Sequence, residues 1–392
     1  MQYFKRFAYI RIALAICVLS ISALGVVKPA FAQNFTVTGT IQYQNPAGVY
    51  VNVQIAKIEI LVNGAVTTSA TDTNGNFSVF VSSGTANPSI QLKVYAQDNN
   101  AAQSVQVKDS NATTLYAAAF PAQNWNLTTP LVMGVKKIDS TNFPATNLPL
   151  AFHIYDQIAV VSRTKLASGP TWTPTFKVDV AFPASTTGSN YDTSNKKINI
   201  ILSDRSLPSV IIHEYGHVVM HMLFVTWPLA INCPSPHSFT DPGNGKCAWT
   251  EGWANFFQAY IRNTGNYDFG GGNTYNLESP TRFGPAFEVS IAGALWDVYD
   301  GVDTAEWDNI SSGIGTSTSG IWGRMQQSTI TNQPFDGPDF LTRWLQNYNV
   351  SNDDLRSIFA WNGMCTRKVT NTGTNTTYQH SCSYTPYVVR QY

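Results

Sequence analysis

Residues 213–217 have the sequence His-Glu-Tyr-Gly-His, and the interpretation of the whole chain starts from this stretch. Two histidines four residues apart share one face of an α-helix, so both imidazoles can reach one metal ion at bond lengths of about 2.1 Å. The carboxylate of Glu214 would then lie beside a metal-bound water and could accept its proton. Pro208 suits the first turn of such a helix, and Ser206 or Ser209 can cap it. The helix would bury its apolar residues Val210, Ile211, Ile212, Val218, Val219, Met220, Leu223 and Phe224.

The third metal ligand is not found on this helix. His221 continues the same face, but eight residues of helix rise about 12 Å, which is too far for His213 and His221 to share one ion. The metzincin pattern needs Gly and His three and six residues after His217, where this chain has Met220 and Leu223. The ligand is therefore expected on another segment.

The best candidate is Glu251, within the sequence Trp-Thr-Glu-Gly-Trp-Ala-Asn-Phe-Phe at residues 249–257. This stretch predicts a second amphipathic helix. Its apolar face consists of Trp253, Phe256, Phe257 and Tyr260. Glu251 is an isolated acid near the start of this helix, and Asn255 follows one turn later. We expect Asn255 to accept a hydrogen bond from a ligand imidazole, which would fix the tautomer of that ring.

The order of these motifs resembles the gluzincin zinc peptidases, the thermolysin-like peptidase MA group. In that group a glutamate on a later helix is the third zinc ligand, often with an aspartate four residues on, where this chain has Asn255. Residues 291–300, Ile-Ala-Gly-Ala-Leu-Trp-Asp-Val-Tyr-Asp, are similar to the apolar helix ending in Leu-Trp-Asp of bacterial members. The resemblance covers roughly residues 205–300. It implies one Zn²⁺ per chain, with the ligands His213, His217 and Glu251.

A zinc ion held by two imidazoles and one carboxylate keeps one position open for water. The metal lowers the pKa of that water toward about 7 and polarises a carbonyl oxygen. Glu214 is expected to act first as general base and then as general acid, which predicts peptide hydrolysis through a tetrahedral intermediate.

Two further site residues are expected on the 291–300 stretch. The oxyanion of the intermediate needs a donor besides zinc. Tyr299 is favoured for this role, with Tyr267, Tyr275 and His237 as alternatives, and a helix-packing role for Tyr299 stays open. Asp297 is expected to hold a ligand or a loop by a hydrogen bond, with a helix cap or a surface charge as equal alternatives.

The first 32 residues have the pattern of a secretory signal. Basic residues come first, an apolar stretch runs from Ile12 to Val27, and Ala30-Phe-Ala32 is a small-x-small cleavage site. The apolar stretch is shorter than the ~20 residues that span a bilayer, which argues against a membrane anchor. We therefore predict a secreted, periplasmic or cell-surface protein, cleaved near Ala32, without stable membrane insertion afterwards.

Composition and cysteine usage fit an exported protein. Charged residues are only 12% of the chain and the formal net charge is zero, which excludes a basic surface for nucleic acid. Cys17 lies in the signal, and an even number of cysteines remains beyond it, which predicts disulfides. The pairs Cys233–Cys247 and Cys365–Cys382 are favoured because each closes a short loop rich in Pro, Gly, Asn or Thr. Thiolate metal binding is disfavoured because the chain has no Cys-x-x-Cys.

The part of the chain before the metal motifs is β-rich. Residues 33–130 alternate apolar and polar side chains between hairpin turns at Asn63-Gly64 and Asn74-Gly75, which predicts an all-β sandwich. The turn at residues 71–77 resembles that of carboxypeptidase-regulatory-like, transthyretin-type sandwiches. All candidate ligands lie beyond residue 200, so this sandwich is expected to be dispensable for the chemistry.

The rest of the chain is predicted to be one metallopeptidase domain. Residues 131–149, with several Pro, Asn and Thr, are expected to be a linker, and residues 150–392 the catalytic domain. A helix over 150–166 and strands at 176–182 and 197–202 precede the metal helix. The fold class is therefore α+β: an all-β sandwich followed by a mainly α-helical zincin-type domain with a small sheet.

These observations predict an exported zinc-dependent metallopeptidase that acts on a protein or peptide substrate. Two other functions are compatible with the residues: a zinc-bearing protein that binds a surface polymer without catalysis, and a zinc hydrolase of non-peptide esters or amides. The intact Glu214 argues against the first of these, because a purely structural zinc site does not need that carboxylate.

Overall fold

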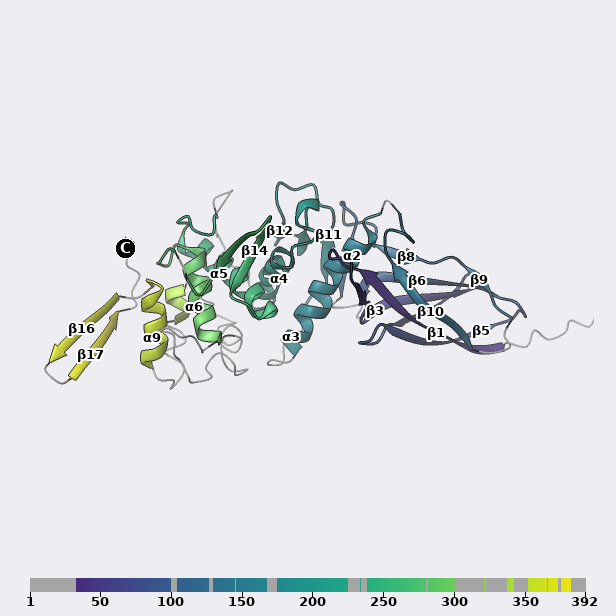
Figure 1. Ribbon diagram of the computed structural model, residues 1–392, viewed down its shortest axis with the longest axis horizontal. Helices are drawn as coiled ribbons and strands as arrows, with labels where there is room; N and C mark the ends of the chain where they lie inside the picture. Colours follow the sequence, from purple (N-terminus) through teal and green to yellow (C-terminus); the bar gives the residue numbers. More distant parts are fainter. Residues whose placement is uncertain are drawn as a thin grey trace, which may run out of the picture.

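The computed structural model of the chain has the predicted α+β architecture (Figure 1). A β-rich part lies at one end of an elongated molecule, helices follow, and a C-terminal hairpin lies at the other end. The structure describes residues 33–99, 104–126, 130–144, 146–167, 175–224, 233, 238–279, 281–300, 321, 337–341, 352–364, 366–372 and 375–381. The predicted signal at 1–32 lies outside these residues, and none of the helices within them has the length and apolar character needed to cross a membrane.

The first sheet has four strands, in which β1 pairs with each of the other three. They are β1 (Gln33–Gln44), β2 (Tyr50–Asn52), β5 (Asn76–Ser83) and β10 (Leu131–Ile138). Side chains alternate strictly along β5, where Phe77, Val79 and Val81 are buried and Phe80 is exposed. This alternation is the period of a strand with one face on a core. The prediction of an all-β N-terminal part is confirmed.

The expected linker at residues 131–149 is wrong over its first half. Residues Leu131–Ile138 form β10, which runs parallel to β1 within the first sheet. Its inward side chains are buried, and they are Leu131, Met133 and Ile138. Burial of these apolar groups stabilises the strand. The polar residues that suggested a linker lie in the following turn, where the Asp139 carboxylate accepts hydrogen bonds from the backbone N–H groups of Thr141 and Asn142.

The second sheet has nine strands and runs from the β-rich part into the helical part. In spatial order it contains β12 (Asn190–Asp192), β13 (Lys197–Asn199), β11 (Val178–Ala181), β7 (Val105–Lys108), β6 (Ser89–Asp98), β3 (Ala56–Val62) and β4 (Ala65–Ala70), while β8 (Ala117–Ala119) and β9 (Gln123–Asn124) pair with β6. β11 lies parallel to β7, with Val178 opposite Val105. The predicted small sheet is thus a continuation of the sheet of the β-rich part. We call the segment from β1 to β10, residues 33–138, the β-unit.

One helical segment follows the β-unit and packs on it. α2 (Leu148–Tyr155), the π-helix η1 (Asp156–Ser162) and α3 (Arg163–Ala167) continue one another, where the sequence predicts a helix over 150–166. The Tyr155 hydroxyl donates to the backbone carbonyl of Gln54 at 3.0 Å, and the Tyr43 hydroxyl donates to the Asp156 carboxylate at 3.1 Å. These contacts join the segment to the β-unit. A short 3₁₀ turn, η2 (Leu202–Asp204), then leads to the metal motif.

Three helices form the centre of the helical part. α4 (Pro208–Leu223) carries the His-Glu-Tyr-Gly-His motif, α5 (Gly245–Arg262) packs against α4, and α6 (Glu288–Asp300) packs against α5. α4 has Leu207 at its N-cap, so neither of the expected serines caps it. The hydroxyl of Ser209 instead accepts hydrogen bonds from Arg262 and from the backbone N–H of Asp268. It thereby ties the start of α4 to the end of α5.

Two hairpins and a helix complete the described fold. β14 (Asn266–Gly270) pairs with β15 (Asn273–Asn276) after α5, α9 (Asn352–Trp361) packs on α6, and β16 (Thr366–Thr372) pairs with β17 (Asn375–Ser381). The last hairpin closes with Thr366 opposite Ser381. The predicted bridge between Cys365 and Cys382 falls on the next residue at each end, outside the described residues.

Candidate metal centre

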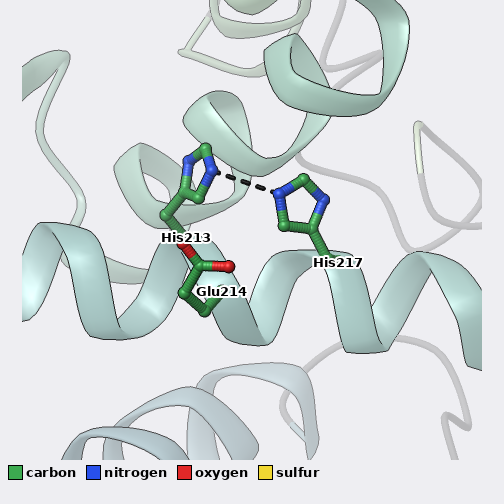
Figure 2. Close-up of side chains that lie close together, drawn as sticks. All are labelled: His213, Glu214 and His217. Atoms are coloured by element: carbon green, nitrogen blue, oxygen red, sulfur yellow. Dashed lines mark hydrogen bonds between the residues drawn. The ribbon is translucent and has the colours of Figure 1, made fainter. Parts of the chain in front are cut away.

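The two motif histidines and one glutamate of α5 converge on one point. His213 and His217 lie on the same face of α4 with their Nε2 atoms 3.2 Å apart (Figure 2). The Oε2 atom of Glu251 lies 3.2 Å from each of these nitrogens. All three side chains are buried. The structure thus brings together the three residues that the sequence indicated as metal ligands.

The dimensions of this triangle suit a small divalent cation. In a tetrahedral zinc site with bonds of 2.0–2.1 Å, neighbouring ligand atoms are about 3.3 Å apart. The observed separations of 3.2 Å match this value on all three sides. Two imidazole nitrogens and one carboxylate oxygen are also the donor set of catalytic zinc sites that keep a position for water. The residues therefore fit such an ion.

Glu214 lies beside the triangle. Its carboxylate has an oxygen within 4.8 Å of the ligand atoms of His213 and His217, so it too belongs to a possible metal-binding group. Glu251 comes closer, at 3.2 Å from both nitrogens, and the helical position of Glu214 turns it to one side of the two imidazoles (Figure 2). This arrangement leaves Glu251 as the better ligand and Glu214 as a carboxylate next to the ligands.

The charge state of Glu251 is set by its surroundings. Burial by itself raises the pKa of this carboxyl, because it disfavours the charged form. The adjacent imidazoles of His217 and His213 outweigh burial and hold the pKa of Glu251 well below its usual value. The carboxylate is therefore ionised at neutral pH and can contribute a negative charge to a bound cation.

A cavity of about 370 Å³ opens over the triangle. Its lining, besides His213, Glu214, His217 and Glu251, consists of Ser189, Asn190, Tyr191 and Thr193 around β12, the mutually contacting rings of Phe239, Tyr267 and Phe269, and Thr250, Asn255 and Glu288 from α5 and α6. Pockets that hold small ligands begin at about 300 Å³. The cavity can therefore hold several groups of a bound molecule beside the metal ligands.

His221 and Tyr191 connect α4 to the wall of this cavity. The Tyr191 hydroxyl and the Nδ1 atom of His221 are 2.8 Å apart. His221 therefore contacts β12, and it is not among the residues that line the cavity. β12 is an edge strand of the second sheet, paired with β13 on one side only among the described strands.

Asn255 lines the cavity, but it does not make the hydrogen bond that the sequence predicted. Its amide donates to the carboxylate of Glu288 at 3.4 Å, and no hydrogen bond to a ligand imidazole is found within the described part of the chain. Glu288, buried at the start of α6, is a site residue that the sequence analysis missed. A buried acid in the first turn of a helix next to the Leu-Trp-Asp stretch was the available signal.

The predicted role of Tyr299 is wrong, because this residue does not line the cavity. Its hydroxyl donates to Asn263 and accepts from Lys165, each at 3.3 Å. Glu288 reaches the cavity from the start of α6, and eleven residues of helix carry Tyr299 about 16 Å further on. Among the alternatives, Tyr275 is not a lining residue either, His237 lies outside the described residues, and Tyr267 lines the cavity.

Tyr267 packs beside the candidate metal ligand His213. Its ring lies 6.0 Å from that of His213 in an edge-to-face arrangement. Burial, reinforced by the nearby carboxylates of Glu214 and Glu251, raises the pKa of its hydroxyl well above the usual value. Tyr267 therefore remains protonated and can act as a hydrogen-bond donor.

Asp297 holds a loop, which is one of the roles expected from the sequence. Its carboxylate accepts a hydrogen bond from the Asn362 amide at 2.9 Å, and both side chains are buried. Asn362 directly follows α9. Asp297 thus fastens the end of α9 to α6.

The bridge between Cys233 and Cys247 is present, as predicted, with Cα atoms 5.1 Å apart. Cys247 lies in the first turn of α5, where Asn244 caps the helix by accepting from its backbone N–H. Glu251 follows one turn later, and the Cys233 sulfur lies 3.9 Å from its Oε1 atom. The bridge therefore fixes the chain next to the third candidate ligand.

Comparison with known proteins relates this region to metallopeptidases. Residues 172–343 match the model of the mycolysin C-terminal domain, and the matched range contains α4, α5 and α6. An uncharacterised protein from Archaeoglobus fulgidus is 30% identical over 133 residues, which are 32% of this chain and 36% of that protein. The chain thus spans about a third of the length of this relative. The central part of the chain is accordingly related to a metallopeptidase-associated family.

Proposed function

We propose that this chain is an exported zinc metallopeptidase that hydrolyses peptide bonds of a protein or peptide substrate. In this proposal one Zn²⁺ is held by His213, His217 and Glu251. The observation that carries it is the convergence of two imidazole nitrogens and one carboxylate oxygen at mutual distances of 3.2 Å. The match to the mycolysin C-terminal domain supports it, because that match covers all three residues.

Glu214 is the proposed general base. A bound zinc ion supplies an acidified water and polarises a carbonyl group. The Glu214 carboxylate, buried beside the ligands, takes up a proton at the cavity and passes it to the departing amine. The Tyr267 hydroxyl, which stays protonated in the same cavity, donates to the oxygen on which negative charge develops. Glu288 and Asn255 contribute a hydrogen-bonded polar pair to the lining of the same cavity.

The cavity also offers places for an extended peptide. β12 has an unshared edge among the described strands, and an extended chain can pair with such an edge through its backbone. Another part of the cavity wall is aromatic, with the rings of Phe239 and Phe269 at 5.3 Å and those of Tyr267 and Phe269 at 4.5 Å. An apolar side chain of the substrate would pack on this wall.

Export and domain organisation are part of the same proposal. Residues 1–32 are proposed to be a signal that is removed near Ala32, and the β-unit to be a carboxypeptidase-regulatory-like sandwich. The described bridge between Cys233 and Cys247 supports export, because disulfides persist in oxidising compartments.

Digestion of casein and of an ester panel, with and without a chelator, tests this proposal. We expect cleavage of casein that the chelator abolishes and that added zinc restores. Hydrolysis of esters alone would favour a non-peptide hydrolase. Zinc binding without turnover of either class would favour a binding protein.

A further inference from the structure

Tyr215 lies between Glu214 and Gly216 in the metal motif, yet it is not among the cavity residues. Its side chain is fully buried, and its hydroxyl accepts a hydrogen bond from Nε of Arg163 at 3.3 Å. Arg163 is the first residue of α3. The motif helix is therefore held on its far side by a residue outside the candidate site.

Arg163 is itself fixed by the β-unit. Its Nη1 atom lies 2.5 Å from the Oδ2 atom of Asp98, the last residue of β6. That oxygen also accepts a hydrogen bond from the backbone N–H of Val105 in β7. The two side chains are mostly buried, with 15% of Arg163 and 5% of Asp98 exposed. A buried guanidinium is planar and rigid, and leaving its partner unpaired is strongly unfavourable, so the ion pair fixes where Arg163 can point.

The next residue of the same helical turn, Gly216, is fixed by α5. A Cβ atom on Gly216 would lie 3.1 Å from both the Cα of Ala254 and the Cβ of Phe257, so the two helices are in close backbone contact. The indole N–H of Trp253 donates to the carbonyl of Gly216 at 3.0 Å. Tyr215 and Gly216 thus hold the turn between His213 and His217.

We propose that Asp98 and Arg163 are positioning residues for the metal site. They act through Tyr215 and make the β-unit a scaffold for the metal helix. This inference rests on the proposed function, because it assigns the positioning to that site. The ligand triangle joins α4 to α5, so its 3.2 Å sides depend on where α4 sits against α5. A displacement of about 1 Å in such a constellation costs up to about 100-fold in rate.

Two conservative changes test the proposal in the full-length chain. Tyr215→Phe removes only the hydroxyl, and Arg163→Lys keeps a cation beside Asp98 while losing the Nε–H donor. We expect each variant to bind zinc about 10-fold more weakly in competition with a chromophoric chelator. With cobalt in place of zinc, each should show an altered visible absorption spectrum. We expect kcat on a peptide to fall about 10-fold with KM nearly unchanged, and the double variant to be no worse than either single one, because both remove the same hydrogen bond.

Lys108→Met is the control. Lys108 pairs with Asp179 at 2.7 Å between two strands of the second sheet, so this change removes a whole ion pair but leaves the hydrogen bond between Arg163 and Tyr215 in place. It should leave zinc affinity, the cobalt spectrum and kcat unchanged.

The proposal is overturned if folded Tyr215→Phe and Arg163→Lys proteins match the wild type in zinc affinity and cobalt spectrum. It is also overturned if Lys108→Met alters these properties as much as they do. Should the wild type bind zinc but cleave no peptide, the proposed function fails, while affinity and spectrum still decide the positioning role. A wild type that binds no zinc would overturn both.

Discussion

The metal centre can be compared with a second buried cluster of a histidine and a carboxylate in the described part of the chain, which lacks the geometry of a site. In the metal centre the imidazoles and Glu251 converge with all separations at 3.2 Å. In the junction cluster, which we define as Tyr43, His153 and Asp156, the carboxylate faces the tyrosine instead. Neither ring nitrogen of His153 makes a hydrogen bond to the described residues. Convergence of ligand atoms, and not burial or residue type, distinguishes the two clusters.

The electrostatics of the two clusters differ in the same way. At the metal centre the imidazoles hold the pKa of Glu251 well below its usual value, against the effect of burial. In the junction cluster burial dominates: it lowers the pKa of His153 to about 4 and raises that of Asp156 to about 6. The first arrangement favours the charged form of its carboxyl, as a cation site requires. The second favours neutral groups and suits a structural interface.

The largest expected effect comes from removing residues 33–130, which are the β-unit without β10 and include Tyr43 of the junction cluster. The sequence suggested that a protein starting at residue 131 would keep the chemistry. The structure leads us to expect that it does not fold, because β11 would lose its parallel partner β7 and Arg163 would lose Asp98. Circular dichroism and zinc binding of this fragment provide the test. A folded, zinc-loaded and active fragment would show that the two clusters are independent.

Glu214→Gln should separate chemistry from metal binding at the first cluster. Removing a general base costs about 10²–10⁴-fold in kcat. The amide keeps the size of the side chain and removes no proposed ligand, so zinc content should be unchanged. Peptide-cleavage assays give kcat, and metal analysis of the same sample gives the zinc content. Wild-type turnover in Glu214→Gln would rule out the general-base role.

The disulfide between Cys233 and Cys247, next to Glu251, should stabilise the metal centre. Its two cysteines are 14 residues apart in sequence, and a loop of this size stabilises the folded state by about 3 kcal/mol. We expect Cys233→Ser/Cys247→Ser to unfold at lower denaturant concentration and to lose several-fold activity, because Glu251 is one turn from Cys247.

Cys365→Ser/Cys382→Ser is the matched control, with the predicted second bridge removed from the C-terminal tail. It should affect activity less. An equal loss of activity in both double variants would mean that the first bridge has no particular connection to the metal centre.

The free energy of unfolding should depend on pH in opposite directions through His153 and Asp156, the two residues of the junction cluster that titrate in the acid range. Between about pH 4 and 6.5 the unfolded chain binds a proton at His153 that the folded chain does not, so acid destabilises the fold over this range. Between 3.8 and about 6 the folded chain keeps a proton on Asp156 that the unfolded chain has lost, so ionisation destabilises the fold as pH rises. Above pH 6 the folded state bears the full free-energy cost of an ionised, buried Asp156.

Asp156→Asn should therefore stabilise the protein at pH 7 by about 1–3 kcal/mol, because it removes this penalty and keeps an acceptor for Tyr43. His153→Leu should reduce the loss of stability between pH 6.5 and 4. Denaturant unfolding at several pH values measures both effects, and zinc content should stay the same. A destabilised Asp156→Asn protein at pH 7 would contradict the assigned direction.

Residue patterns within single segments were enough to predict the parts of this fold that form locally. The alternation in the β-unit and the spacing of His213 and His217 follow from the periods of strand and helix. The short loop between Cys233 and Cys247 likewise indicated the bridge. Long-range contacts could not be predicted in this way. β10 pairs with β1 across about 90 residues, and β11 joins β7 across about 70.

The same distinction holds within the site. Glu251 could be found because it is the isolated acid of an apolar helix. Glu288 and the true position of Tyr299 depend on how α6 packs on α5, which a residue pattern on one helix does not encode. The contact of Tyr215 with Arg163 and that of Arg163 with Asp98 bring together three separate elements, and each residue taken alone suggests only packing or a surface charge.

The most direct test of the account is the zinc content of purified full-length protein, measured for the wild type, Glu251→Ala and Glu214→Gln. The two variants change carboxylates that both lie in the same cavity, but only Glu251 completes the triangle. We predict about one zinc per chain in the wild type and in Glu214→Gln, and a large loss in Glu251→Ala. Normal zinc content in Glu251→Ala, or a wild type that binds no zinc, would contradict the account.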